Sequence, residues 1–160
     1  DRQPGSGRYA APRSGPRRRV LGAVHRKPAD LCANLSRGHA AFAAHAPAGH
    51  AVRAGDWVVL AGQIPLDPAT GVLVEGDIAD QANRVIANIV AVLGDVGGAL
   101  TDIAKATVFL VDLADFAVVN GIYAEAFGDH HPARSTIQVA ALPAGARVEI
   151  EVWAYLPIEG

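Results

Sequence analysis

The sequence contains no methionine and only one cysteine among its 160 residues. One cysteine cannot form an internal disulfide, so Cys32 excludes a fold held by such bonds and fits a reducing, cytoplasmic location. No apolar run approaches the roughly 20 residues that a membrane-spanning helix needs, so we predict a soluble protein without a membrane partner. Because position 1 is not methionine, we expect that the chain as given is processed or incomplete.

Basic residues are scarce in most of the chain. Residues 41–160 contain five Lys and Arg against fourteen Asp and Glu, whereas residues 1–40 contain nine basic and two acidic residues. An acidic stretch without interleaved aromatic and basic residues does not favour nucleic acid as a partner. The basic end is typical either of an arm that contacts nucleic acid or a membrane, or of a poorly ordered extension rich in Arg, Pro and Gly. We predict the second.

The length and composition allow one compact core. About half of the residues are hydrophobic (51%), and 160 residues are too few for two ordinary domains. Residues 1–46 show no sustained apolar periodicity, and we predict that they form the basic extension. Residues 47–160 are predicted to form the single domain.

Within this domain, the apolar periodicity predicts strands, a helix, a strand, a helix and two further strands. Asp77 precedes one helical apolar stripe and Asp115 another, and each is predicted to cap its helix. The first stripe consists of Ile78, Ala82, Val85, Ile86, Ile89 and Leu93, and the second of Phe116, Val119, Tyr123 and Phe127. This order indicates an α+β fold with one sheet and two helices on one face. The predicted elements are a hairpin (51–53 and 57–64), a turn (67–71), a short strand (72–74), helices 78–93 and 116–127, and strands 103–111, 133–139 and 148–155.

The last two predicted strands each carry ionisable groups on a face that is not apolar. We interpret the two strands as adjacent, with these groups on the face that the helices leave open. An arginine and a carboxylate placed in this way can together hold a small anion and a water molecule. The residues on these faces are Arg134, Thr136 and Gln138 in the first strand, and Glu149, Glu151, Trp153 and Tyr155 in the second.

The open face of the sheet is predicted to include Lys105, Thr107 and Phe109 as well. The alternating residues of the same strand are predicted to face the helices: Ala104, Ala106, Val108 and Leu110. A sheet face that mixes aromatic and charged side chains usually meets another subunit. We therefore predict an oligomer whose sites lie at the subunit boundary.

Seven short motifs, in order and at matching spacing, resemble the RidA/YjgF family, the reactive-intermediate deaminases. The resemblance covers about residues 47–157, and residues 1–46 have no counterpart in it. No single motif is decisive, but the ordered set is highly specific. The motifs are 51–56 (AVRAGD), 62–65 (GQIP), 67–71 (DPATG), 105–109 (KATVF), 115–120 (DFAVVN), 132–135 (PARS) and 142–151, which runs from Leu-Pro to Val-Glu-Ile-Glu.

The resemblance implies a chorismate-mutase-like α+β subunit that assembles as a homotrimer, with a cleft between each pair of neighbours. Members of the family are deaminases of the 2-iminobutanoate/2-iminopropanoate type. They hydrolyse enamine and imine intermediates, such as 2-aminoacrylate, to 2-keto acids and ammonia. Neither a metal nor an organic cofactor is implied. The expected partners are therefore a small imino or keto acid and two further copies of the chain.

The resemblance also assigns roles to three residues of this chain. Arg134 stands where the family arginine clamps the substrate carboxylate, a role that suits its planar fork of donors. Glu149 matches the family carboxylate that positions the attacking water and can transfer a proton. Gly62 lies where family backbone groups contact the ligand, and the absence of a Cβ permits this approach.

Three further positions match or depart from the family pattern. Asn120 matches a family asparagine near the cleft, and Thr136 replaces a frequent cysteine. Ala61 stands where a serine often precedes the Gly-Gln-Ile-Pro motif. In addition, Pro47-Ala48-Gly49-His50 lacks the tyrosine-bearing run that lines the family site. Each loss removes a polar contact to the substrate and leaves the fold untouched.

Other interpretations follow from the residues alone. Arg134 is then better explained by an ion pair with a carboxylate across a subunit interface, and Glu149 equally well by a carboxylate that faces water. His130 and His131 are adjacent on a loop and lack further ligands at useful spacing, so we predict a solvated loop and not a metal site. The two leading hypotheses are an enamine/imine deaminase and a non-catalytic relative that binds small carboxylates as a sensor or scaffold; endoribonuclease activity is a weaker third.

Overall fold

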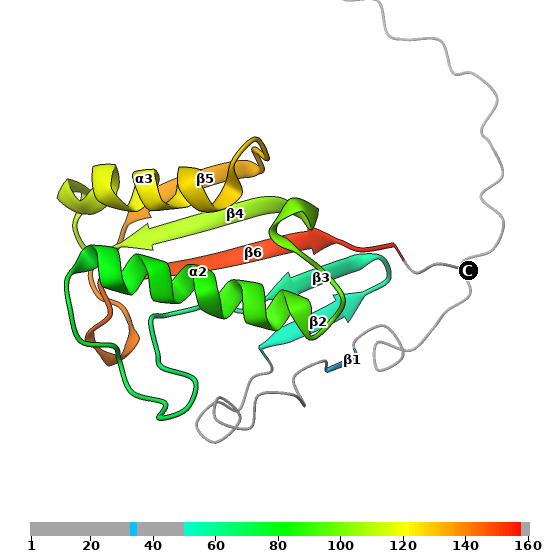
Figure 1. Ribbon diagram of the computed structural model, residues 1–160, viewed down its shortest axis with the longest axis horizontal. Coiled ribbons are helices and arrows are strands. Elements are labelled where there is room, and N and C mark those ends of the chain that lie inside the picture. The colour runs from blue at the N-terminus through cyan, green and yellow to red at the C-terminus, as the bar shows by residue number, and fades with distance from the viewer. Residues whose placement is uncertain (1–32, 35–49, 158–160) are drawn as a thin grey trace, which may run out of the picture.

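The computed structural model describes residues 33–34 and 50–157 (Figure 1). Within these residues the chain forms six strands, two α-helices and three short 3₁₀ turns. The strands are β1 (Ala33–Asn34), β2 (Ala51–Ala54), β3 (Trp57–Leu60), β4 (Ile103–Leu110), β5 (Ala133–Gln138) and β6 (Val148–Tyr155); the helices are α2 (Ile78–Gly94) and α3 (Phe116–Phe127); the 3₁₀ turns are Leu100–Asp102, Leu113–Asp115 and Pro143–Gly145.

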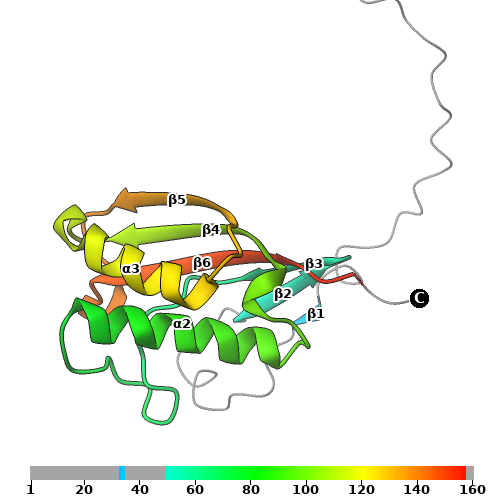
Figure 2. The same cartoon turned by 45° about the horizontal axis from the view of Figure 1, so that its top comes forward.

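The strands form one mixed sheet in the order β1-β2-β3-β6-β4-β5. All pairs are antiparallel except β4 and β5, which are parallel and are joined through α3. Such a parallel connection needs a crossover, and a helix supplies it. Figure 2 shows α2 and α3 on the same side of the sheet. The predicted α+β fold, with one sheet and two helices on one face, is therefore confirmed.

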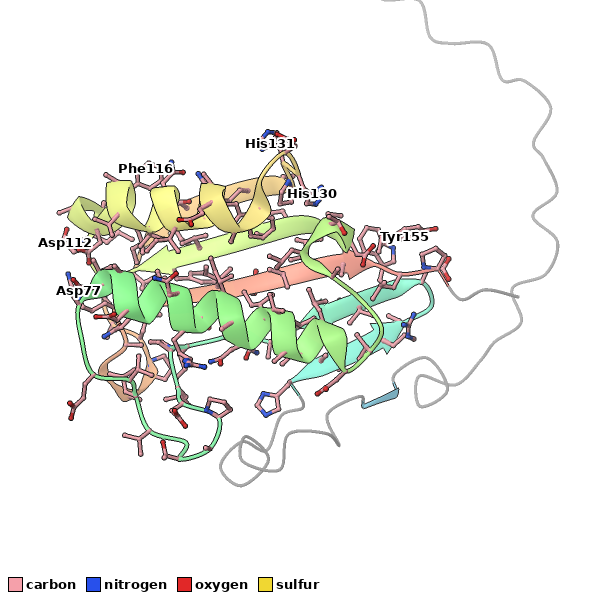
Figure 3. All side chains as sticks on the ribbon, in the orientation of Figure 1. Asp77, Asp112, Phe116, His130, His131 and Tyr155 are labelled. Atoms are coloured by element: carbon pink, nitrogen blue, oxygen red, sulfur yellow. The ribbon has the colours of Figure 1, made fainter. Side chains whose placement is uncertain are left out.

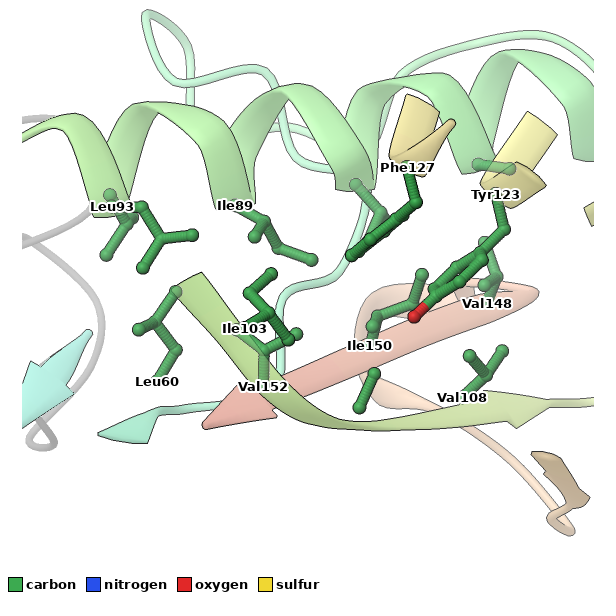
Figure 4. Packing of buried hydrophobic residues seen from close by; sticks show 14 of the residues in the cluster. Leu60, Ile89, Leu93, Ile103, Val108, Tyr123, Phe127, Val148, Ile150 and Val152 are labelled. Carbon is green, nitrogen blue, oxygen red and sulfur yellow. The ribbon is translucent and has the colours of Figure 1, made fainter. Parts of the chain in front are cut away.

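The core lies between the two helices and the sheet (Figure 4). Helix α2 begins as predicted at Asp77, whose side chain accepts hydrogen bonds from the amides of Ala79 and Asp80, while Asp80 accepts one from the amide of Asp77. This capping box satisfies backbone donors that the first turn leaves free. The whole predicted apolar stripe of α2 is buried: Ile78, Ala82, Val85, Ile86, Ile89 and Leu93.

Several predicted details differ from the structure. Residues 72–74 do not form a strand, because only Leu73 makes an isolated bridge, to Leu66. Ala104 was expected in the core but is exposed, because a bulge between Ile103 and Lys105 shifts the alternation by one residue. Strand β1, which pairs with β2, lies within residues 1–46, the segment that we expected to be an extension. The rest of that segment lies outside the described residues.

Asp115 does not cap α3 with its side chain, in contrast to our prediction. Both of its carboxylate oxygens accept hydrogen bonds from Nη2 of Arg147, each at 2.7 Å. Asp112 instead caps the 3₁₀ turn that precedes α3, by accepting a hydrogen bond from the amide of Ala114. Phe116 at the start of α3 is 40% exposed and not part of the core stripe as we expected (Figure 3). The buried Asp115 instead ties the start of α3 to the loop before β6.

Asn88 connects α2 to the loop that follows β3. This buried side chain donates hydrogen bonds from Nδ2 to the carbonyl oxygens of Ile64 (3.2 Å) and Leu66 (3.0 Å). We expect Asn88→Ala to lower the free energy of unfolding by about 1–3 kcal/mol, because it removes the buried side-chain amide that donates to both loop carbonyl groups. Urea denaturation measures this change. The control Asn83→Ala removes only an exposed bond within α2 and should change stability by less than ~0.5 kcal/mol; equal effects of both changes would contradict this role.

Candidate functional site

The predicted site residues fall into two groups on opposite faces of the sheet. Arg134 pairs in register with the buried Ala106 of β4, and therefore points to the helix face. Glu149 is opposite Phe109 and points to the open face, because its neighbours Val148 and Ile150 fill the core.

Our expectation that Arg134 and Glu149 share a face is therefore wrong, and so is the expectation that their strands are adjacent. Strand β4 lies between β5 and β6. Alternation along a strand separates its two faces but does not say which one the helices cover.

Arg134 is held by neutral groups beneath α3. Its Nη2 donates to Oδ1 of Asn120 at 2.7 Å, and its guanidinium carbon lies 4.6 Å from the ring centroid of Tyr123 and 5.8 Å from that of Phe116. Aromatic faces attract a cation without neutralising it. Within the part of the chain that the structure describes, no carboxylate pairs with Arg134. The guanidinium is therefore a preorganised positive charge without a counter-ion from its own subunit's described residues.

A pocket of about 330 Å³ lies beside this guanidinium, between α3 and the start of β5. None of the residues that line it is acidic, which leaves the charge of Arg134 as its main electrostatic feature. A cavity with apolar walls and one placed charged group is a common form of small-molecule site. Its lining consists of Asn120, Tyr123, Ala124, Phe127, Gly128, His130, His131, Pro132 and Arg134.

Thr136 belongs to the same group as Arg134. It pairs in register with the buried Val108 and is half-buried on the helix face. Gln138, the next residue on this face, accepts a hydrogen bond from the amide of Leu113 and so fixes the end of β5. The structure thus brings together Arg134, Asn120 and Thr136 from β5 and α3.

The second group gathers around Glu149. A Cβ added to Gly62 would overlap the Glu149 carboxylate, so only glycine lets this side chain lie against the backbone at that position. Burial raises the pKa of Glu149, and the nearby charge of Glu151 raises it further. A carboxyl group with a raised pKa is suited to accept and return a proton near neutral pH.

The segment that carries Gly62 is tied to the sheet beside Glu149. The amide of Gln63 donates to the carbonyl oxygen of Ile150 at 2.9 Å, and the amide of Ile150 donates to the carbonyl oxygen of Gln63 at 3.1 Å. Ala61 is exposed, and its amide donates to the carbonyl oxygen of His50. Ala61, Gly62 and Glu149 therefore form a second group, away from the Arg134 pocket.

Sequence reasoning missed the contact between the ring of Tyr123 and the guanidinium of Arg134. We expected Tyr123 only in the apolar stripe of α3, where it is indeed buried. Its spacing of three residues from Asn120 was the signal that both face β5. Burial raises the pKa of Tyr123 to about 12, despite the opposing effect of Arg134. The ring therefore stays neutral and supports the guanidinium as a flat surface.

Among the residues that the structure describes, no group of three or more His, Cys, Asp or Glu is placed to hold a metal ion. His130 is not simply solvated as we expected: a ring nitrogen lies 2.7 Å from the carbonyl oxygen of Ile103, and the ring stacks on Phe127. His131 is exposed in the loop (Figure 3). No helix among residues 33–34 and 50–157 is long and apolar enough to cross a bilayer.

Comparison with known proteins places the chain in a family. Residues 38–156 match the family model described as Endoribonuclease L-PSP. The chain is 44% identical over 112 residues to a 2-iminobutanoate/2-iminopropanoate deaminase of Bos taurus, a match that covers 70% of this chain and 82% of the relative.

Solved structures agree. A Rid-family protein of Yersinia pestis, described as of unknown function, has a TM-score of 0.69 and 44% identity, over 71% of this chain and 90% of its own. TdcF of E. coli, solved with bound serine, has a TM-score of 0.66 and 40% identity, over 70% and 90%. The family model spans the strands and helices from β2 to β6. The chain therefore belongs to the RidA/YjgF family.

Proposed function

We propose that this protein is a hydrolytic deaminase of enamine and imine intermediates, which it converts to 2-keto acids and ammonia. The observation that carries the proposal is the guanidinium of Arg134. It lies beside a pocket, is oriented by Asn120 and Tyr123, and has no carboxylate partner among the described residues. Two parallel hydrogen bonds from such a group suit a substrate carboxylate. The deaminase name of the relative from cattle and the serine in TdcF support the same ligand class.

Glu149 is proposed to supply the water chemistry. In its ionised form it accepts a proton from water as the water oxygen attacks the imine carbon. The protonated carboxyl then returns that proton to the nitrogen, which gives a carbinolamine. Glu149 next accepts the hydroxyl proton and passes it to the nitrogen as the carbon–nitrogen bond breaks, so that ammonia leaves and the carbonyl forms. An enamine substrate first becomes an imine by taking a proton at carbon and losing one from nitrogen. The raised pKa of Glu149 supports this exchange of one proton in both directions.

A complete site needs two subunits, since Arg134 and Glu149 face opposite sides of the same sheet. We propose a homotrimer in which Arg134, Asn120 and Thr136 of one subunit meet Glu149, Gly62 and Ala61 of the next. The open face supports such contacts, because Trp57, Trp153 and Tyr155 on it are 40%, 47% and 46% exposed. Their burial at an interface would remove large apolar surfaces from water. Light scattering of the full chain should therefore give a trimer.

A mixing experiment tests the shared site. Arg134→Ala and Glu149→Gln chains should each be inactive as homotrimers. When equal amounts are unfolded and refolded together, a cleft is intact if Arg134 comes from one chain and Glu149 from the other, which holds for about a quarter of random clefts. We expect about a quarter of wild-type activity, measured as keto acid released when a serine or threonine dehydratase supplies the enamine. No gain on mixing would contradict the shared site.

A sensor or scaffold that binds small carboxylates is the alternative, favoured by the alanine at position 61, where a serine is frequent in the family. It predicts binding of 2-keto acids to Arg134 with no turnover in the dehydratase assay. The endoribonuclease name of the family model is not favoured as an activity here, because residues 41–160 carry five basic and fourteen acidic residues. An acidic surface repels the phosphate backbone of RNA.

A further inference from the structure

The pocket beside Arg134 is larger than a short acid requires. Its volume of about 330 Å³ lies within the range of about 300–1,000 Å³ that is usual for small-molecule sites. Arg134 stands at one part of the lining, and the remaining lining extends along α3 to Gly128 and into the loop before β5. In the single subunit, the carboxylate and carbon skeleton of 2-aminoacrylate would leave most of this space unfilled.

The walls beyond the guanidinium are flat and mostly apolar. The rings of Tyr123 and Phe127 stack with centroids 4.1 Å apart and planes 13° apart, and those of Phe127 and His130 with centroids 6.3 Å apart and planes 18° apart. The ring of His130 is held by the 2.7 Å contact with the carbonyl oxygen of Ile103. Three nearly parallel rings therefore line one pocket. Tyr123 and Phe127 are fixed by the core, and His130 is fixed by the backbone.

These walls match a particular kind of side chain. An aromatic ring placed against stacked rings gains offset or edge contacts beyond the burial of its area. The absence of any acidic lining residue also avoids repulsion of the substrate carboxylate at Arg134. A charged side chain, in contrast, would lose its hydration with no opposite charge except the guanidinium, which the carboxylate already occupies.

We propose that this pocket is a specificity site for the side chain of aromatic 2-imino acids, with the substrate carboxylate on Arg134 and the ring against the exposed edges of the three stacked rings. The inference rests on the proposed function, because it uses the same guanidinium as the carboxylate clamp. It adds the class of substrate: imines derived from phenylalanine-like amino acids are preferred over those derived from alanine. One methylene in an apolar pocket gives about 10–200-fold discrimination, so a whole ring should give at least tenfold.

Ala124 offers a way to block the pocket without disturbing the core. It lies on the pocket lining and is exposed on α3, so Ala124→Phe should fill the space from the solvent side. The matched control is Ala117→Phe, which makes the same change at an exposed position of α3 outside the pocket lining. Circular dichroism and light scattering establish that both variants keep the fold and the oligomeric state of the full chain.

The experiment measures the binding of pyruvate and phenylpyruvate by calorimetry, and kcat/KM for imines made in situ from alanine and phenylalanine by an amino-acid oxidase. We expect the wild type to prefer the aromatic ligand by at least tenfold. Ala124→Phe should weaken phenylpyruvate binding at least tenfold more than pyruvate binding, and Ala117→Phe should retain the wild-type preference.

Three outcomes would overturn the inference. Two of them affect only the specificity pocket, and the third also affects the proposed function. Equal affinity of the wild type for both acids, or equal weakening of both by Ala124→Phe, removes the specificity pocket and leaves the deaminase proposal intact. If neither acid binds the wild type at all, the clamp itself fails, and the proposed function fails with it.

Discussion

Arg134→Ala is expected to abolish both 2-keto-acid binding and deamination while the fold remains. Two hydrogen bonds to a carboxylate, at about 1.5–3 kcal/mol each, correspond to a loss of about 10²–10⁴-fold at 1.36 kcal/mol per tenfold. No other basic residue lines the pocket except the two histidines, so the lost charge has no ready substitute. Calorimetry with pyruvate and the dehydratase-coupled assay measure the two losses.

Arg134→Lys should also be poor, because an ammonium group cannot donate two parallel bonds or stack on Tyr123 as a planar guanidinium does. The control is Arg84→Ala, which removes an arginine from α2 on a different part of the surface. It should leave activity unchanged. An active alanine variant at position 134 would exclude the clamp and return that residue to an ordinary interface role.

Glu149→Gln is expected to remove activity and, at the same time, to raise stability near neutral pH. A general base contributes about 10²–10⁴-fold to a rate, and glutamine cannot accept the proton. The stability effect follows from the raised pKa of Glu149. A carboxyl whose pKa is higher in the folded than in the unfolded protein contributes stability below the unfolded value, and this contribution is lost as pH rises through the folded value. Glutamine does not ionise, so the folded variant does not lose this stability as the pH rises.

The melting temperature of Glu149→Gln should therefore exceed that of the wild type at pH 7, and the two should converge below pH ~4, where the unfolded glutamate is protonated. The control is Glu151→Gln on the same strand face. It should keep activity and move the acid limb of the pH–rate profile to lower pH, because Glu151 helps to raise the pKa of Glu149. Wild-type turnover in Glu149→Gln would exclude its role in water activation.

Local patterns were sufficient for most of the fold. The capped stripe after Asp77 predicted α2 with its buried face, because helical spacing and the capping box are both local features. Local patterns failed where a residue distant in sequence determines the contact or the register. Asp115 is a good cap residue by type, but Arg147, distant in sequence, takes its carboxylate. The alternation of β4 was disturbed at Ala104 by a bulge, which depends on pairing with β6.

The sequence by itself determined the identities of Arg134 and Glu149 as candidates, the α+β order and the family, because each follows from residue type, spacing or ordered motifs. Only the tertiary structure decided that β4 lies between β5 and β6 and that Arg134 points to the helix face. Strand order and the choice of face depend on which surfaces the helices cover, and α3 covers β5 through Asn120 and Tyr123. Alternation along a single strand carries no information about that choice.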